Sequence, residues 1–580
     1  MKRAWGPLFC AAVLVAACEH ERVRKLSDAS PTERLQDAGM VADGGAAQAI
    51  DAGAAQSSGA APSSNDAGMM QSGLAPAAAP SAPEPARPVP AVSQTPSGSA
   101  LLELPPAAQP IVTIALQFRS GAIDDPHGKA GVTNLTAHLM AEGGTQSLDA
   151  KQLLNALFPL AAELNVRVDK ELTTFSGRVH KDHLAKFLPI FTDVVLHPRF
   201  DSNEFKRLRE DAVNDVEKRL RQGDDEDLGK SALSELIYKD HPYGRLTIGH
   251  ASDLKSLSLE DLKAQAAKVF TLDRLTIALS GSRPDSMGKE LAQSLSALPA
   301  KADPVAAIPA ALPHGPRFLL VEKLSDATAI SMGLPYGLSH KDPDWAAMSI
   351  ARSAFGEHRQ FNGRLMQRLR ELRGLNYGDY AYIEAFRQEG GDASQAQAGR
   401  ARHQQELSIW VRPVQNENRL FAVRAVLYEL NRSLTDEPFT AAEVAQTKGF
   451  LDGYLLLFDQ TETRKLGFAL DDAFYGMNGF LGAWHQALRQ VTAEQVNAAW
   501  RKWVDPSKLE IVLAGKDMEA VKQVIVSNAA TPIHYQVDAT GKSAEKPPAQ
   551  LTTDKEIEKL SFGAKGDADV AVVKVGQEFE

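Results

Sequence analysis

Cysteine is almost absent from this sequence. The chain has 580 residues and two cysteines, Cys10 and Cys18, both within its first 18 residues. The rest of the chain therefore has no thiol for a disulfide bond, a cysteine-based zinc site or a cysteine nucleophile. A metal site there would need histidine and carboxylate ligands.

The sequence also lacks a positive net charge and long hydrophobic runs. It has 63 lysine and arginine residues against 73 aspartate and glutamate residues, which gives a formal net charge of −10 at pH 7. Such a chain offers no basic field for a phosphate backbone, so we expect no nucleic-acid partner. After the first 18 residues, no apolar run approaches the length of a membrane span.

Residues 1–18 have the pattern of a bacterial export signal. Two basic residues precede an apolar stretch that runs to Ala17 and is too short to remain as a membrane span. The last four residues, VAAC, resemble a lipobox, which implies cleavage and lipid attachment at Cys18. We therefore expect an exported protein anchored by lipid to a bacterial membrane, at its periplasmic face or at the cell surface. The alternative is an ordinary signal peptide with an incidental cysteine.

Residues 19–100 are dominated by alanine, proline, serine, glycine and aspartate. A segment of this composition cannot bury enough apolar surface to offset the entropy lost on ordering. We expect it to be a disordered tether between the lipid and the folded region.

The remainder of the chain contains an internal repeat. Residues 258–281 align without gaps on residues 492–515, at a constant offset of 234 and with seven identical positions. Both copies begin with a capping-box-like pair, continue as a helix and end as an apolar strand that finishes in glycine. The repeat predicts a duplicated architecture.

The strands that open the two copies support this prediction. Residues 113–118 and 330–335 each form an apolar run, and each run leads through Asp-Pro to a segment of helical periodicity. We predict two α+β domains, residues 101–300 and 313–525, each a mainly antiparallel sheet covered by helices on one face. Residues 526–580 form a C-terminal extension with one late strand-like run.

Three segments resemble the pitrilysin/insulinase family of metallopeptidases, which includes the mitochondrial processing peptidases. Residues 131–145, GVTNLTAHLMAEGGT, are similar to the segment that carries the family's inverted zinc motif, H-x-x-E-H. Residues 241–245, HPYGR, and residues 364–377, RLMQRLRELRGLNY, are the other two matches. The resemblance spans roughly residues 110–525 and implies that the two domains face each other across a cleft.

The zinc motif itself is not preserved. In the family, two imidazoles one helical turn apart bind zinc, and a glutamate between them acts as general base. If Gly144 and Thr145 mark the end of the motif, its three positions fall on Leu135, His138 and Leu139.

A second register is possible when Gly131 is used as the anchor. The three positions then fall on Asn134, Ala137 and His138, so one imidazole survives. In either register the first imidazole and the carboxylate base are missing. The resemblance therefore implies a chain that holds no zinc of its own.

The equivalent of the family's third zinc ligand is a single carboxylate. The predicted helix 203–221 carries Glu210 and Glu217, seven residues apart as two acidic positions are in the relatives, and Glu217 matches the ligand. One carboxylate cannot hold zinc against water. On so charged a helix, the alternative is that Glu217 belongs to a solvated face.

Two other pairs have spacings that suit metal ligands. His138 and Glu142 share a helical face, and His180 and His183 have an H-x-x-H spacing at a predicted strand-to-helix turn. Neither pair has a third ligand, so hydrogen bonding and surface exposure are the alternative interpretations.

The second domain keeps an arginine and a tyrosine that match a functional pair in the family. The predicted helix 364–373 should stop at Gly374, which places Arg370 on its last turns and Tyr377 just beyond. The resemblance implies that these two side chains reach across the cleft to bind the substrate carbonyl and stabilise an oxyanion. The alternative is a surface arginine and a buried tyrosine.

Three functions are consistent with these features. The first is a non-catalytic subunit that supplies Arg370 and Tyr377 to unfolded peptides, in complex with a homologous chain that carries the zinc. The second is a peptide-binding or scaffold protein that uses the inherited cleft. The third, a free-standing peptidase, requires metal ligands outside the family motif.

Overall fold

The computed structural model describes residues 92–580 except 302–303, 306, 313–316, 358–361, 377, 386–397 and 537–543. The predicted signal, the lipid site at Cys18, most of the predicted tether and Tyr377 lie outside the described residues. None of the helices in the described part is both long enough and apolar enough to cross a membrane.

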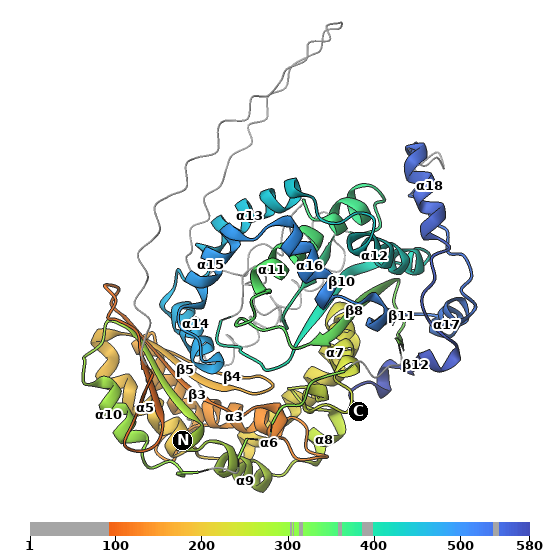
Figure 1. Ribbon diagram of the computed structural model, residues 1–580. Helices are drawn as coiled ribbons and strands as arrows, with labels where there is room; N and C mark the ends of the chain where they lie inside the picture. Colours follow the sequence, from red (N-terminus) through yellow and green to blue (C-terminus); the bar gives the residue numbers. More distant parts are fainter. Residues whose placement is uncertain are drawn as a thin grey trace, which may run out of the picture. The chain divides into compact units, whose positions relative to one another are not determined.

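The strands form two six-stranded sheets (Figure 1). The first has the order β1-β2-β6-β3-β5-β4, and its strands are β1 (Val92–Gln94), β2 (Ala100–Glu103), β3 (Ile111–Phe118), β4 (Glu163–Val168), β5 (Thr173–His180) and β6 (Leu275–Gly281). The second has the order β12-β7-β11-β8-β10-β9, and its strands are β7 (Phe318–Glu322), β8 (Ala327–Tyr336), β9 (Asp379–Tyr382), β10 (Gln405–Gln415), β11 (Glu510–Gly515) and β12 (Val570–Lys574).

The two sheets share one pairing pattern. In the first sheet β2 runs parallel to β6, and β6, β3, β5 and β4 follow as antiparallel neighbours. In the second sheet β7 runs parallel to β11, and β11, β8, β10 and β9 follow in the same way. The predicted α+β class and the mainly antiparallel sheets are confirmed.

The helices of the N-terminal half lie between residues 132 and 295. They are α3 (Val132–Glu142), α4 (Ala150–Leu157), α5 (Leu184–Leu196), α6 (Ser202–Asn214), the π-helix η5 (Asp215–Gly223), α7 (Asp225–Ile237), α8 (Ala251–Ser256), α9 (Leu259–Val269) and α10 (Met287–Leu295). The predicted helix 203–221 is therefore α6 followed by a π-helix. α3, α5, α9 and α10 contribute to the core on one face of the first sheet.

The helices of the C-terminal half follow the same plan. They are α11 (Trp345–Gly356), the π-helix η8 (Met366–Glu371), α12 (Arg419–Leu434), α13 (Ala441–Leu455), α14 (Glu462–Tyr475), α15 (Phe480–Gln490), α16 (Ala493–Trp503), α17 (Met518–Ser527) and α18 (Pro548–Ile557). α9 and α16 both begin with the predicted capping boxes, Ser258 with Asp261 and Thr492 with Gln495. The repeat at an offset of 234 residues is thus a structural repeat.

Each sheet is also covered on its second face, by a helix from the other half. α7 packs on the second sheet, where Leu233 and its apolar neighbours share a cluster with Val321 and Val512. α14 packs on the first sheet, where Leu470 shares a cluster with Ala115 and other small apolar residues. The prediction of helices on one face was therefore incomplete, because each half supplies one helix to the other half's sheet.

Both ends of the described chain add edge strands. β1 pairs with β2, so residues 92–100, at the end of the segment predicted as a disordered tether, belong to the first sheet. β12 pairs in parallel with β7, which makes the C-terminal extension part of the second sheet. The last residues then reach the N-terminal half, where Arg221 donates to Glu580 at 2.8 Å and Ala251 N donates to Phe579 O at 2.9 Å (Figure 1).

We predict that Gly131→Ala destabilises the fold. Gly131 starts α3 with a φ of 89°, and an added Cβ would lie 2.6 Å from Ile248 O and 2.7 Å from the Cα of Gly249. A left-handed alanine with two backbone clashes should cost more than about 1 kcal/mol in the free energy of unfolding.

Gly449→Ala is the matched control for this measurement. Gly449 is exposed within α13, and an added Cβ there would meet nothing within 4 Å. Urea denaturation should show stabilisation by about 0.5–1 kcal/mol for the control. Equal stability of Gly131→Ala and the wild type would contradict the described start of α3.

Candidate functional site

The loop before α3 fixes where this helix begins. The carboxylate of Asp125 is buried and accepts hydrogen bonds from Gly131 N at 2.7 Å, Thr133 N at 2.9 Å and the Thr133 hydroxyl at 2.6 Å. Burial raises the pKa of Asp125 to about 6, although these hydrogen bonds oppose the shift. Arg245, from the HPYGR segment, donates to the carbonyl oxygen of Asp125. Asp125 thus anchors the start of α3, and the HPYGR segment holds the loop that carries Asp125.

The lost-motif positions on α3 divide between two environments. Leu135 and Leu139 are 2% and 0% exposed and belong to an apolar cluster that also contains Val216 of η5. Ala137 belongs to the core between α3 and the first sheet. Two buried leucines offer no lone pair, so the residues present at Leu135 and Leu139 do not fit a zinc ion.

The polar lost-motif positions are only partly buried. Asn134 is intermediate in exposure, and the His138 side chain is 36% exposed. His138 Nδ1 lies 2.9 Å from Oε1 of Glu142, and Arg207 Nη2 lies 3.7 Å from the other carboxylate oxygen, Oε2. The hydrogen bond with His138 lowers the pKa of Glu142. This pair is already engaged within the helical surface.

Glu217 lies on η5, beside the buried Val216. Its carboxylate accepts a hydrogen bond from Lys255 at 2.5 Å, and this bond lowers its pKa. Glu210 is exposed on α6. The structure therefore places Glu217 in a surface ion pair.

The second histidine pair lies at the end of β5, as the sequence predicted. The rings of His180 and His183 are 6.2 Å apart, and His180 Nδ1 accepts a hydrogen bond from Asp182 N. Within the described part of the chain, no three histidine, cysteine, aspartate or glutamate side chains are grouped so that they could hold a metal ion.

The arginine-rich segment 364–373 differs from the predicted helix in one respect. Residues Met366–Glu371 form a π-helix, a form that often occurs at functional positions. The predicted stop is confirmed, because Gly374 has a φ of 66° and its N–H donates to Arg370 O at 2.7 Å.

Three of the four arginines on this segment bind other elements. Arg364 binds Glu443 of α13 at 2.8 Å, and Arg368 binds Glu429 of α12 at 3.0 Å. Arg373 binds Asp554 of α18 at 2.8 Å. These three ion pairs hold the segment against the helices that surround it.

Arg370 has a different environment. Its side chain is 30% exposed, its Nε lies 3.7 Å from Glu371, and its Nη1 lies 3.8 Å from the sulfur of Met366. Both contacts are with residues on its own helix. The guanidinium charge also favours the ionised form of Asp379, and it therefore opposes the rise in pKa that burial causes.

Asp379 is an acidic group near Arg370 whose pKa departs strongly from its ordinary value. Its side chain is fully buried, and Asn376 donates a hydrogen bond to its Oδ1 at 2.7 Å. Burial raises its pKa to about 7, although this hydrogen bond and the charge of Arg370 oppose the shift. Tyr377, the predicted partner of Arg370, lies outside the described residues.

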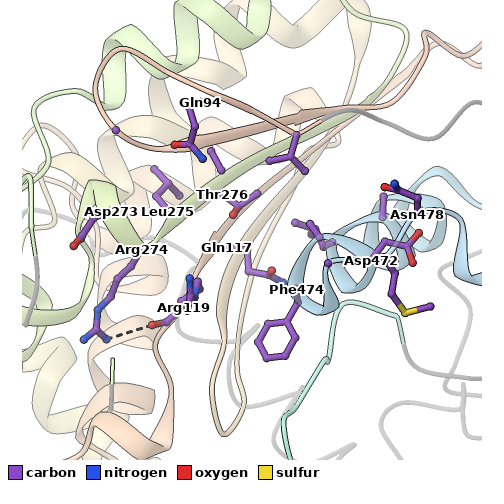
Figure 2. A pocket seen from close by; sticks show the side chains of 18 of the residues that line it. Gln94, Gln117, Arg119, Asp273, Arg274, Leu275, Thr276, Asp472, Phe474 and Asn478 are labelled. Carbon is purple, nitrogen blue, oxygen red and sulfur yellow. Dashed lines mark hydrogen bonds between the residues drawn. The ribbon is translucent and has the colours of Figure 1, made fainter. Parts of the chain in front are cut away.

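A cavity of about 540 Å³ lies between the first sheet and the end of α14 (Figure 2). One row of residues crosses the sheet beneath this cavity. It runs from Gln94 on β1 through Ala100 on β2 and Thr276 on β6 to Gln117 on β3, because each of these residues pairs with the next. Phe474 and Asn478 face this row from α14 and the turn after it. The next row toward α14 is apolar and is covered by that helix.

Two family models match this chain. One, described as "Insulinase (Peptidase family M16)", matches residues 103–250, and the other, described as "Peptidase M16 inactive domain", matches residues 256–450. The chain belongs to the insulinase family. Its first match contains α3 and the lost zinc motif, and its second contains η8 and Arg370.

Individual relatives agree with this assignment. An uncharacterized zinc protease of Mycobacterium bovis is 25% identical over 389 residues, which cover 66% of this chain and 83% of that protein. A Helicobacter pylori protein named as a non-peptidase homolog is 25% identical over 281 residues, 47% of this chain and 62% of that protein. The family thus contains relatives named as proteases and at least one named as a non-peptidase.

A solved structure supports the fold. The crystal structure of a peptidase M16 inactive domain from Pseudomonas fluorescens has a TM-score of 0.65 and 24% sequence identity, and it covers 74% of this chain and 98% of that one.

A buried polar network, which was not predicted from the sequence, joins the two halves of this insulinase-family chain. Glu171 is 5% exposed, accepts a hydrogen bond from the Tyr243 hydroxyl, and accepts another from His403 N at 2.8 Å. Nearby, Asp169 and Arg402 form an ion pair. Burial raises the pKa of Asp169, but the charges of Arg402 and Arg400, with hydrogen bonds from Arg402 and Lys170 N, together hold the pKa well below its ordinary value. The one available signal was Tyr243, which lies in the HPYGR segment.

We predict that Asp379 makes stability depend on pH. The pKa of Asp379 is about 7 in the folded chain and about 3.9 in an unfolded one, so the folded state binds the extra proton between these values. The contribution of Asp379 is therefore fully present below about pH 4 and is lost as the pH rises to 7.

Asp379→Asn tests this dependence, because its amide oxygen can still accept the Asn376 hydrogen bond. Relative to the wild type, the variant should gain stability between pH 5 and pH 8 in urea denaturation. A constant difference across that range would show that Asp379 titrates normally.

Proposed function

We propose that this chain is the non-catalytic subunit of a two-chain peptidase. In this arrangement a homologous partner carries the zinc, and this chain contributes Arg370 and Tyr377 to the site that cleaves unfolded peptides. The observation that carries the proposal is a combination of two features. Two of the lost-motif positions are buried leucines, and Arg370 is partly exposed on a segment that three ion pairs hold against α12, α13 and α18.

The apolar replacement of the zinc motif supports a non-catalytic role. Leu135 and Leu139 share one cluster with Val216, which precedes Glu217, the match to the third ligand. This common location favours the register that places the motif on Leu135, His138 and Leu139. In that register the face that binds metal in the relatives has become part of the hydrophobic core.

The chemistry of the retained pair suits a contributed site. A guanidinium and a phenol are both hydrogen-bond donors, and they can bind a substrate carbonyl and stabilise the negative charge that develops on its oxygen. Neither donor needs a metal on its own chain. The zinc, when bound to the partner, would supply the Lewis acid.

The predicted N-terminal features give this subunit a location. A lipid at Cys18 would attach it to the membrane, and the segment before β1 would act as a tether. Both features lie outside the described residues. Metabolic labelling with a radioactive fatty acid, compared between the wild type and Cys18→Ala, tests the attachment.

We predict that Arg370→Ala lowers peptide cleavage by the reconstituted pair. Loss of one donor to an oxyanion costs about 100-fold to 1,000-fold in kcat, so we expect a decrease of that size with an unchanged fold. Cleavage of a fluorogenic unstructured peptide, with the partner chain that co-purifies from the native membrane, measures the effect.

Arg501→Ala is the matched control for this experiment. Arg501 is exposed on α16, outside the segment that carries Arg370. The control should cleave at the wild-type rate. Unchanged cleavage by Arg370→Ala in an active pair would rule out the assigned role.

The cavity beside α14 favours a second candidate function, a peptide-binding or scaffold protein without catalytic duty. Its row of amide and hydroxyl side chains, Gln94, Thr276 and Gln117, can form hydrogen bonds with a peptide backbone. Equal peptide affinity for the wild type and Arg370→Ala, loss of affinity in Gln117→Leu, and recovery of no zinc-bearing chain would favour this function.

A further inference from the structure

The C-terminal extension contacts the end of the helix that bears Arg370. Gln550 Nε2, on α18, donates to Leu372 O at 2.9 Å, and Lys546 Nζ donates to the same oxygen at 3.3 Å. The extension lies beyond the residues matched by the two family models, which end at residue 450. This contact is therefore a feature outside the family's matched segments.

A buried ion pair strengthens the contact. Arg373 and Asp554 have side chains that are 2% and 6% exposed, and their closest atoms are 2.8 Å apart. Asp554 also accepts a hydrogen bond from the Tyr535 hydroxyl at 2.5 Å, while Arg373 Nη1 donates to Arg368 O at 2.7 Å. One guanidinium thus joins α18 to the last turn of η8, and removal of its buried partner would leave an unbalanced charge.

The extension completes the hydrogen bonding at this helix end. The last carbonyl groups of a helix have no partners within the helix and must find them elsewhere. Leu369 O and Arg370 O accept from the backbone after the helix, at Leu375 N and Gly374 N. Arg368 O accepts from Arg373, and Leu372 O accepts from α18.

We propose that α18 is a positioning element for Arg370, with Asp554 acting through Arg373 and Gln550 acting through Leu372. The π-helix Met366–Glu371 ends one residue after Arg370, so any fraying of its last turn changes the direction of that side chain. α18 prevents this fraying. The claim that α18 positions Arg370 rests on the proposed function of Arg370. The claim that α18 supports the end of η8 is independent of that function.

Hydrogen exchange on the full-length protein tests the support directly. In Asp554→Asn, the amides of residues 364–376 should exchange about tenfold faster or more, because the buried pair is broken. Gln550→Ala removes two hydrogen bonds, to Leu372 O and to the Tyr535 hydroxyl at 2.7 Å, but keeps the pair of Arg373 and Asp554. It should therefore give a smaller change in the same peptides.

Glu556→Gln is the matched control, because Glu556 also lies on α18 but binds Tyr428 of α12 at 2.8 Å. Its exchange over residues 364–376 should equal that of the wild type. Two outcomes would show that this contact does not support the helix end. Exchange could be unchanged in both Asp554→Asn and Gln550→Ala, or it could be equally faster in all three variants.

Peptide cleavage by the reconstituted pair tests the positioning role. Gln550→Ala should lower kcat and leave KM unchanged, since the donor is misdirected while peptide binding elsewhere is intact. If Arg370→Ala abolishes cleavage but Gln550→Ala keeps the wild-type kcat despite faster exchange, α18 does not position Arg370. If Arg370→Ala cleaves normally, the proposed function fails, and the exchange data still decide whether α18 supports the helix.

Discussion

The fold depends on the need to cover both faces of two apolar sheets. The central strands β3, β8 and β11 are buried along nearly their whole length, so the middle of each sheet needs cover on both faces. Each half covers one face with its own helices and the other with a helix of its counterpart. α7 and α14 are therefore shared elements, and the hydrophobic effect joins the two halves through them.

The same requirement explains the state of the lost zinc motif. α3 lies against both the first sheet and the cluster that contains α6, η5 and α7. Leu135 and Leu139, which stand at two of the predicted motif positions, add hydrocarbon to that cluster. The helix retains a structural role in the core, and its anchors at Asp125 and Arg245 remain.

The second half holds its retained arginine in a contrasting way. The arginine-rich segment 364–373 lies against α12, α13 and α18, and each of these helices forms an ion pair with one arginine of the segment. Arg370 lies on the π-helix of this segment, close to Glu371 and Met366, and its charge opposes the rise in the pKa of the buried Asp379. A partly exposed guanidinium on a segment that three ion pairs hold in place suits the contributed donor that we propose.

The sequence alone determined the features that depend on local interactions. The repeat, the capping boxes at Ser258 and Thr492, and the helix stop at Gly374 follow from neighbouring residues, because caps and turns are satisfied within a few positions of the chain. The absence of an H-x-x-E-H motif from residues 131–145 can also be read from residue types and spacing.

Only the tertiary structure decided the features that join distant residues. These include the exchange of α7 and α14, the pairing of β12 with β7, and the buried contact between Glu171 and His403. Four arginines within ten residues look alike in sequence, and their roles separate only when other helices approach three of them. The physical reason is that burial and charge pairing are properties of the packed chain, and the local pattern does not specify which distant segment provides the partner.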